Sequence, residues 1–543
     1  MSGMENLKKG KCTLSKSSVE NLSEKPLLFV REASGLAKEI GPWSIIFFPI
    51  KASTSPWFFM FIAMLPFMFP GCSVTLSFII AGIIVTFQGL ALALMMVCMP
   101  RSGGNYVVIA RGLHPLFGML EGWRAVVWNP IADAVVSYFA AGFLGASILI
   151  YGQIVHNPQL TSLGQYISTD KGALLSITLA LLVMGALLDF FGARWLKRFM
   201  VVISGLTVVG ILLMIGLFLA HPPASVPSAW DAVWGSGAYK EIVEVAKANG
   251  WTKPSFSLAA TGASLLVATG FLYPNNVAPL GGEVAKPRVS FMVGIGLSGL
   301  ALMGLSAGIA AAMEYSLGDF LHMYDFVVMG GHANQLKLNP GIQPSTSFFA
   351  SSLTTNPGLA LFSALTPFIA VIGLIPMGYF WTTRPFYAMA MDRYSPEKFA
   401  YIHPRWHSPI YSVLYCFILS VIVAILSLYI PVILSISLFI YGTLLPIFWG
   451  WAAMTLPFHR PEIWNRGFRA TVGGFPLMSI FGFITTAVYF YVLFMGIRTV
   501  DPLSIAVTII LLMNSTFWYL YYTYQNKKKG IDVDKIFAAV PPE

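Results

Sequence analysis

The chain has 543 residues, of which 56% are hydrophobic and only 10% are charged, and its formal net charge is +10. A soluble protein carries about 25% charged residues, so the composition excludes a soluble protein. The positive charge is expected of loop cations that orient a membrane protein, and it does not indicate nucleic-acid binding.

The fold class predicted from the sequence is an all-α polytopic membrane protein with twelve transmembrane helices. Apolar residues fall in runs of roughly 18–28, the length of helices that cross a hydrocarbon core about 30 Å thick. Helices are expected because backbone groups in lipid must be satisfied within their own segment. The predicted spans are residues 43–69, 75–98, 117–151, 173–192, 199–220, 257–284, 289–314, 356–382, 409–429, 432–456, 472–497 and 502–523.

The spans suggest a simple domain order. A polar N-terminal segment, 1–42, shows no cleavable signal peptide. Two sets of five helices follow at 43–220 and 257–456, separated by a loop at 221–256, and then helices 11 and 12 at 457–525. The remaining residues, 526–543, are expected to be a flexible tail, basic from Lys527.

The distribution of Lys and Arg predicts the orientation in the membrane. If both termini are cytoplasmic, 26 of these cations lie in cytoplasmic segments and 6 in outer segments, with Lys51 left inside a span. Such a bias indicates a cell-membrane protein with both ends inside. Two long outer loops, 221–256 and 315–355, either cap an extracellular vestibule or are tolerated surface insertions.

The first span is interrupted in its middle by the sequence KASTSP, residues 51–56. Pro56 removes a backbone donor and disfavours α geometry at Ser55. Ser53, Thr54 and Ser55 can hydrogen-bond to nearby backbone and so compete with the helix. The sequence therefore predicts an unwound segment near the bilayer midplane.

The sixth span carries a matching interruption, because Gly270, Pro274 and the pair Asn275–Asn276 break an otherwise apolar run. Spans 1 and 6 each open a five-helix set, and paired interruptions in two halves indicate a transporter's binding site. The ends of half-helices attract an anion at an N-terminus and a cation at a C-terminus, as a zwitterionic amino acid requires. Two proline kinks without a ligand remain the alternative.

Three stretches on the predicted cytoplasmic side carry a family resemblance. They are PRSGGNYVVIARGLHPLFGMLEGW (100–123), GFLYPNNVAPLGGEVAKPR (270–288) and TRPFYAMAMDRYSPEKFAYIHPRWHSP (383–409). Together they resemble the amino acid–polyamine–organocation (APC) superfamily of permeases over roughly residues 31–525. The resemblance implies a leucine-transporter-like fold with two inverted five-helix repeats, in which helices 1 and 6 are broken.

The resemblance also implies a function and a site. The expected function is a secondary-active transporter for amino acids or related amines that alternates access around a midplane site. Alternatives are a carrier for another small organic solute, a non-transporting membrane sensor or a membrane-embedded enzyme. In the family's pattern, Ala52, Ser53, Thr54 and Ser55 would face the substrate carboxylate, and Thr269, Gly270, Phe271 and Leu272 the amine, with Phe271 or Tyr273 as a lid. KASTSP here replaces the family's glycine-rich stretch.

Lys51 and Asp133 are the ionisable residues predicted near the middle of the membrane, where an unpaired charge is expensive. We expect them to approach each other, or Lys51 to occupy the place of a coupling sodium ion. A permanent pair that fixes helix packing, or direct binding of the substrate carboxylate by Lys51, are the alternatives. Some proton-driven members of the resembled family have a lysine on helix 5, where this chain has none, so Lys51 would act from helix 1.

Proton coupling or exchange is preferred to sodium coupling, because span 8 offers Ser363 and Thr366 only in its outer half. Near the inner interface, Glu121, Arg124, Asp189 and Glu283 form either an inner gate or an interfacial ion-pair network. The sequence shows no phosphate-binding loop, disulfide framework or metal-ligand spacing, so neither an enzyme, a cofactor nor a metal site is predicted. The expected partners are a small-molecule substrate, the lipid bilayer and H⁺.

Overall fold

The computed structural model describes residues 35–270, 272–339, 341–436 and 439–540. Within these residues, ten helical segments are long and apolar enough to cross a membrane. They are α4 (Val74–Cys98), α6 (Pro115–Ile154), α8 (Lys171–Phe190), α9 (Ala193–Ala220), α13 with α14 (Pro287–Phe291 and Ser298–Leu317), α17 with α18 (Pro357–Ile372 and Ile375–Met391), α19 (Ile410–Tyr429), α20 (Phe439–His459), α22 (Leu477–Gly496) and α23 (Pro502–Lys528). The predicted all-α polytopic fold is confirmed.

The first and sixth predicted spans are absent from these ten because each is broken. Span 1 consists of α2 (Phe47–Ser53) and α3 (Pro56–Met68), separated at Thr54 and Ser55. Span 6 begins as α12 (Leu258–Gly270), and its second half contains only short 3₁₀ turns at Pro274–Val277 and Gly281–Glu283. The described residues therefore hold ten spans identified by length and composition, together with the two broken spans, which is consistent with the predicted fold.

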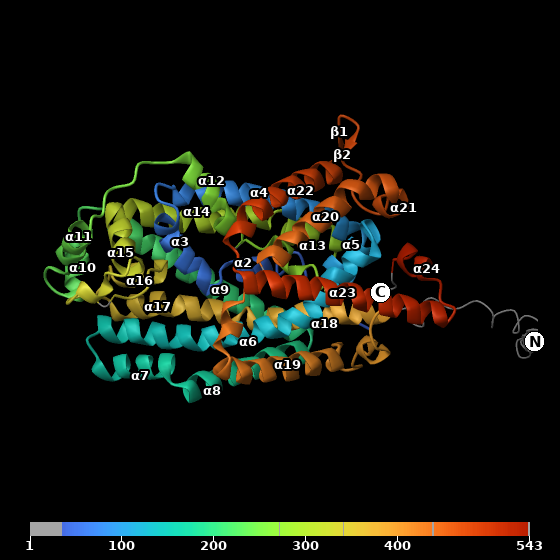
Figure 1. Cartoon of the computed structure of the whole chain (residues 1–543), viewed down its shortest axis with the longest axis horizontal. Helices are drawn as coiled ribbons and strands as arrows, with labels where there is room; N and C mark the ends of the chain where they lie inside the picture. Colours follow the sequence, from blue (N-terminus) through green and yellow to red (C-terminus); the bar gives the residue numbers. More distant parts are fainter. Residues whose placement is uncertain (1–34, 271, 340, 437–438, 541–543) are drawn as a thin grey trace, which may run out of the picture.

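The two long outer loops are not loose insertions, since they fold into one helical cap. The cap consists of α10 (Val226–Trp234), α11 (Ala238–Ala248), α15 (Asp319–Met329) and α16 (Thr346–Ser351). Trp230 is fully buried in it and donates a 2.8 Å hydrogen bond from Nε1 to Oδ1 of Asn339. The cap packs on α3 at the end of the molecule farthest from α24 (Val533–Ala538) (Figure 1).

The opposite end, which we term the terminal side, carries the first described residues, α5 (Gly104–Gly112) and α24. Up to residue 540, the tail is not the flexible end that the sequence predicted. Arg111 donates from Nε to the carbonyl of Ala539 at 3.0 Å, Arg460 donates from Nη2 to the carbonyl of Ala538 at 2.7 Å, and Phe537 is buried. The last carbonyls of α24 thereby bind two arginines, a favourable arrangement for a helix C-terminus.

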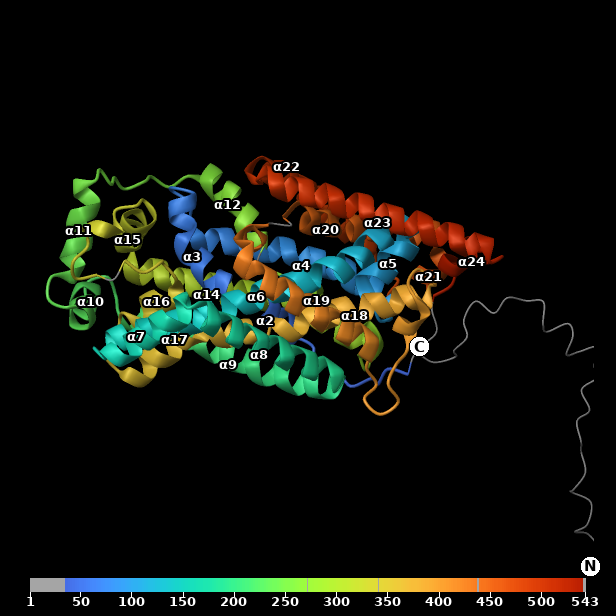
Figure 2. The same cartoon turned by 60° about the horizontal axis from the view of Figure 1, so that its bottom comes forward.

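The remaining elements lie at the periphery. A twelve-residue helix, α7 (Pro158–Thr169), lies between the predicted spans 117–151 and 173–192 and packs closely on α6. A Cβ at Gly164 would lie 2.4 Å from the backbone nitrogen of Leu149, so this contact requires glycine. In Figure 2, α22 and α23 lie along one edge of the bundle and α7, α8 and α9 along the other. Short elements complete the fold: α21 (Pro461–Trp464) and a hairpin of β1 (Thr471–Val472) and β2 (Phe475–Pro476).

Candidate functional site

The two breaks lie side by side in the bundle. The backbone N–H of Tyr273, just beyond α12, donates a 2.8 Å hydrogen bond to Oγ of Ser53, the last residue of α2. The 3₁₀ turn Pro274–Val277 also packs against α2. The two interruptions predicted from the sequence therefore share one place in the structure.

The helix ends at this place are set by local sequence. Thr54 is the last residue whose backbone N–H makes a helical bond in α2, to the carbonyl of Ile50 at 3.0 Å, and its hydroxyl donates to the same carbonyl at 2.8 Å. Ser55 is extended, and Pro56 then starts α3, which has no side-chain cap. Pro56 has no N–H and Phe58 donates its own to the carbonyl of Ser55 at 3.0 Å, but the start of α3 still carries the positive end of the helix dipole, which suits an anion. The last turn of α12 presents carbonyl groups, which suit a cation.

The predicted substrate-binding residues gather around these ends. Ala52, Ser53, Thr54, Ser55, Thr269 and Leu272 are all buried. The side chain of Tyr273 is 38% exposed although it lies at the break, and a Cβ added at Gly270 would meet no atom within 4 Å. These two observations indicate free space beside the break in span 6. Phe271 lies outside the described residues.

Lys51 lies in the last turn of α2 and is 0% exposed. Its Nζ donates to Oγ1 of Thr207 on α9 at 3.2 Å. Its aliphatic stem lies against Gly373, where an added Cβ would come within 2.2 Å of Lys51 Cε. No carboxylate lies within 4.0 Å of Nζ in the described part of the chain, so this amine is hydrogen-bonded to the hydroxyl of Thr207 and is not part of an ion pair.

Asp133 on α6 lies elsewhere. Its carboxylate packs against Gly378 and accepts a weak 3.7 Å contact from Cys416 Sγ. Gly373 lies in the turn between α17 and α18, whereas Gly378 lies in the first turn of α18. Lys51 and Asp133 therefore pack against different parts of span 8, and the predicted ion pair between them is not formed among the described residues.

A buried arginine organises the terminal side of the bundle. Arg384 on α18 binds Asp189 at the end of α8 through Nη1, and Glu283 through Nη2 at 2.9 Å, and all three side chains are fully buried. Thr383 also donates to Asp189 at 2.9 Å. The carbonyl of Glu283 accepts hydrogen bonds from the N–H groups of residues 39 and 40, at 2.9 and 3.0 Å. The cluster thus joins spans 4, 6 and 8 to the segment that leads into α2.

The four residues predicted to form an inner gate belong to two clusters. Glu121 and Arg124 form their own ion pair, at 2.9 Å between Oε2 and Nε, and Arg124 also donates to Asn129 Oδ1 at 3.1 Å. Asp189 and Glu283 instead share Arg384. Sequence reasoning missed Arg384 because span 8 was predicted to end at residue 382, whereas α18 continues to Met391.

Asn276 was recognised in the sequence only as part of an interruption. In the structure its backbone carbonyl accepts from Trp381 Nε1 at 2.7 Å, and its Nδ2 lies 3.3 Å from Met377 Sδ. Its Oδ1 is buried and has no hydrogen-bond partner among the described residues. An unpaired buried amide oxygen next to the break is a candidate acceptor for a substrate amine.

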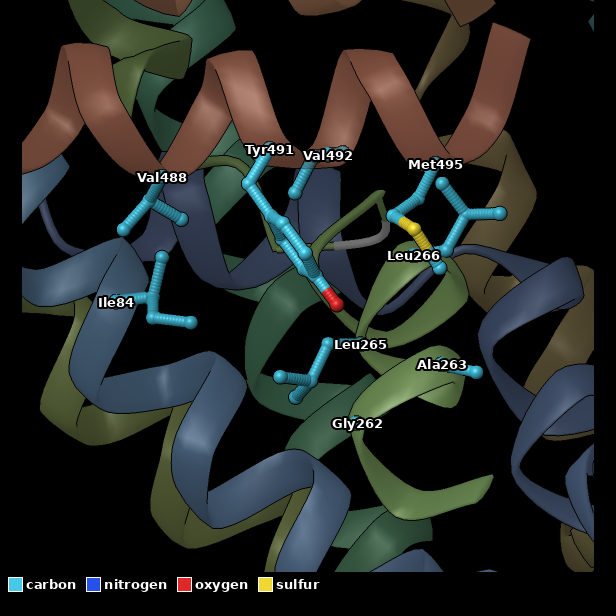
Figure 3. A pocket seen from close by; sticks show the side chains of 9 residues that line it. All are labelled: Ile84, Gly262, Ala263, Leu265, Leu266, Val488, Tyr491, Val492 and Met495. Atoms are coloured by element: carbon cyan, nitrogen blue, oxygen red, sulfur yellow. The ribbon is translucent and has the colours of Figure 1, made fainter. Parts of the chain in front are cut away.

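A separate crevice lies between α4, α12 and α22 (Figure 3). Its lining includes Ile84, Leu265 and Val492, and the ring of Tyr491 points into it. It contains no charged side chain, so its chemistry does not match a zwitterionic solute.

Two comparisons with known proteins bear on this site. The sequence profile of the amino acid permease family matches residues 40–515. Cationic amino acid transporter 4 of Mus musculus is 23% identical over 385 residues, a region that covers 69% of this chain and 52% of the mouse protein. The chain thus spans about half the length of the curated relative it matches.

Proposed function

The chain belongs to the amino acid permease family, and on that premise we propose that it is a secondary-active transporter of amino acids, not an enzyme. The observation that carries this proposal is the hydrogen bond between Tyr273 and Ser53, which joins the two broken spans. Broken backbone at membrane depth is tolerated only where it is buried in protein or lines a cavity. Two such breaks in contact are the arrangement expected of a substrate site in an alternating-access carrier.

The substrate's two charged groups would bind at different helix ends. The carboxylate would lie at the uncapped start of α3, near Ala52, Ser53, Thr54 and Ser55. The amine would lie at the end of α12, near Thr269, Gly270, Leu272 and the free Oδ1 of Asn276. Tyr273 would cover the ligand, because it lies at the break and is partly exposed. Phe271 remains a second predicted lid residue.

Lys51 is proposed as the coupling residue. A buried ammonium with one hydroxyl partner is costly within a membrane, so the charged form needs a further anion or water. Loss of the proton removes that cost, so occupancy of the neighbouring site and protonation of Lys51 would be linked. The contact with Thr207 brings this amine to helix 5, the helix that carries the lysine in some proton-driven members of the resembled superfamily. Asp133 stays a second candidate for the proton path.

The Arg384 cluster is proposed as the inner gate. Spans 1 and 6 are held by it to spans 4 and 8. Opening the site toward the terminal side would require the bond between Arg384 and Glu283 to break. Glu121 and Arg124 would form a second contact of the same kind. The excess of Lys and Arg on the terminal side supports a cytoplasmic location for that side and insertion in the cell membrane.

Reconstitution into proteoliposomes tests the proposed function. We expect uptake of labelled amino acids, with arginine and lysine included because the matched mouse protein is named a cationic amino acid transporter. An inward proton gradient should raise accumulation if coupling uses protons, and preloaded amino acid should raise it if the carrier exchanges. Binding without uptake would instead indicate a sensor, and uptake only of other organic solutes would indicate a different carrier.

A further inference from the structure

A pocket of about 190 Å³ on the terminal side has no part in the site described above. It lies where the turn between α8 and α9, the loop before α19 and the first described residues come together. Its polar and aromatic lining consists of Glu39, Phe191, Arg194, Trp195, Arg405, Trp406 and His407.

The pocket lies at the edge of the lipid-facing surface. On α8, the exposed apolar residues Val183 and Leu187 recur every four positions, and Phe191 at the pocket continues the row. On α9, Val202 and Val209 are exposed, and Trp195, seven residues before Val202, is 50% exposed on the same face. Two lipid-facing rows therefore end in aromatic rings at this pocket, as expected at a membrane–water interface.

Positive charge surrounds the pocket. Arg194 and Lys197 both contact Glu39, at 2.8 and 3.8 Å, so this one carboxylate is shared by two cations. The guanidinium of Arg405 lies 4.8 Å from the ring of Trp406. Among the described residues, no carboxylate lies within 4.0 Å of Arg405. An anion in the pocket would therefore find Arg405 without a competing carboxylate.

We propose that this pocket binds the phosphodiester of an anionic phospholipid headgroup from the adjacent leaflet. Arg194 donates from Nε and Nη2 to Glu39, so Arg405 is the main donor to the phosphate and the Nη1 group of Arg194 is a second. Guanidinium groups suit phosphate oxygens. The first turn of α9 lines the pocket and has no side-chain cap, which adds free N–H donors. The rows that end at Phe191 and Trp195 provide the surface on which acyl chains lie.

The bound lipid would act on the inner gate, and this second step rests on the proposed transport function. Glu39 is a pocket residue, and its N–H, like that of Ile40, donates to the carbonyl of Glu283. A headgroup between Arg405 and Arg194 would hold this segment against spans 4, 5, 8 and 9. Anionic lipid would thereby favour the closed inner gate.

Native mass spectrometry of the full chain in detergent tests the binding step independently of transport. Phosphatidylglycerol should bind more tightly than phosphatidylcholine, and Arg405→Gln should weaken phosphatidylglycerol binding about fivefold, the effect of one basic residue at a membrane surface. Arg469→Gln, which removes a cation from the loop between α20 and α22, is the matched control and should leave binding unchanged. Equal phosphatidylglycerol affinity in Arg405→Gln and the unaltered chain would overturn the proposal.

A second measurement separates a lipid from a soluble anion. The thermal unfolding midpoint of the unaltered chain should rise with short-chain phosphatidylglycerol and should not rise with inorganic phosphate at the same concentration, and the rise should be smaller in Arg405→Gln. An equal rise with inorganic phosphate would overturn the assignment to lipid and indicate a site for a free phosphate. If the unaltered chain binds phosphatidylglycerol as expected but takes up no amino acid, the proposed function is wrong and the lipid site is not affected.

Discussion

The backbone N–H of Tyr273 donates a 2.8 Å hydrogen bond to Oγ of Ser53, and this contact joins two segments that are 220 residues apart in the chain. One segment ends α2 and the other follows α12, so the bond links the two broken spans at their ends. A hydroxyl can make this link because it accepts from a backbone group that helix termination leaves free.

Ser53→Ala is expected to destabilise the protein and to reduce amino acid uptake. The substitution removes the acceptor of the Tyr273 N–H, and the loss of one partly buried hydrogen bond costs about 0.5–1.5 kcal/mol. Thermal unfolding in detergent and uptake in proteoliposomes measure both effects. Ser176→Ala is the control, because its hydroxyl is exposed on α8 and bonds only within its own helix. Unchanged stability and uptake in Ser53→Ala would show that the link has no importance.

Lys51→Met is expected to abolish proton-driven accumulation and to preserve exchange. Methionine retains an unbranched side chain against Gly373 and lacks the titrating amine. A gradient of one pH unit represents about 1.4 kcal/mol, so it supports up to about tenfold accumulation by a carrier that moves one proton per substrate. The ratio of internal to external amino acid at steady state measures this.

Lys247→Met, an exposed substitution in the outer cap, should behave like the unaltered chain in the same assay. Retention of the full pH response in Lys51→Met would remove Lys51 from the coupling mechanism. A raised KM for exchange as well as for accumulation would instead assign Lys51 to the substrate carboxylate.

Arg384→Gln is expected to cost about 3–5 kcal/mol, because it leaves two buried carboxylates without their common partner. A double-mutant cycle with Glu283→Gln isolates the contact that we assign to the inner gate. We expect a coupling free energy of about 0.5–3 kcal/mol between the two sites. Arg469→Gln, on an exposed loop, is the charge-matched control. Additive effects of the two substitutions would contradict a direct interaction.

The helical cap should be less stable in acid, because Glu241 becomes protonated. Burial works to raise the pKa of this carboxyl, but hydrogen bonds from the amide of Asn339 and from the N–H groups of residues 337–339 outweigh it and hold the pKa below its ordinary value of 4.5. The stabilisation is therefore complete above pH 4.5 and is lost as the pH falls through the lower pKa of the folded state.

The measurement compares the unfolding midpoint of the unaltered chain with that of Glu241→Gln. The difference should be largest at pH 7 and should shrink as the pH is lowered below 4.5, since the protonated carboxyl then resembles the amide. Glu244→Gln, whose carboxylate is mostly exposed, should show little difference at either pH. A difference that is independent of pH would show that ionised Glu241 does not stabilise the cap.

The breaks in spans 1 and 6 were predictable because their causes are local. Pro56 starts α3 and Pro274 starts a 3₁₀ turn, because neither residue has the backbone N–H that a preceding helix would need to continue through it. The structure of the second half of span 6 could not be predicted. Proline and glycine identify an interruption, but they do not specify whether 3₁₀ turns replace the helix.

Partners distant in sequence were the main source of error. Arg384 bonds to residues 195 and 101 positions away, and no local pattern relates them. Lys51 and Asp133 are separated because Lys51 packs against Gly373, in the turn between α17 and α18, and Asp133 packs against Gly378 in α18. Counting residues placed both near the midplane, but rotation about the helix axis, which packing decides, determines whether they meet.

The central claim, that the two breaks form the amino acid site, is tested most directly by thiol accessibility at Tyr273→Cys, made in a chain whose four native cysteines are replaced by serine. A small soluble thiol reagent should react with this cysteine, and a transported amino acid should slow the reaction at the concentration that half-saturates uptake. Tyr166→Cys on exposed α7 should react equally fast with or without the amino acid. Unprotected reaction at Tyr273→Cys, in a variant that still transports, would contradict the claim.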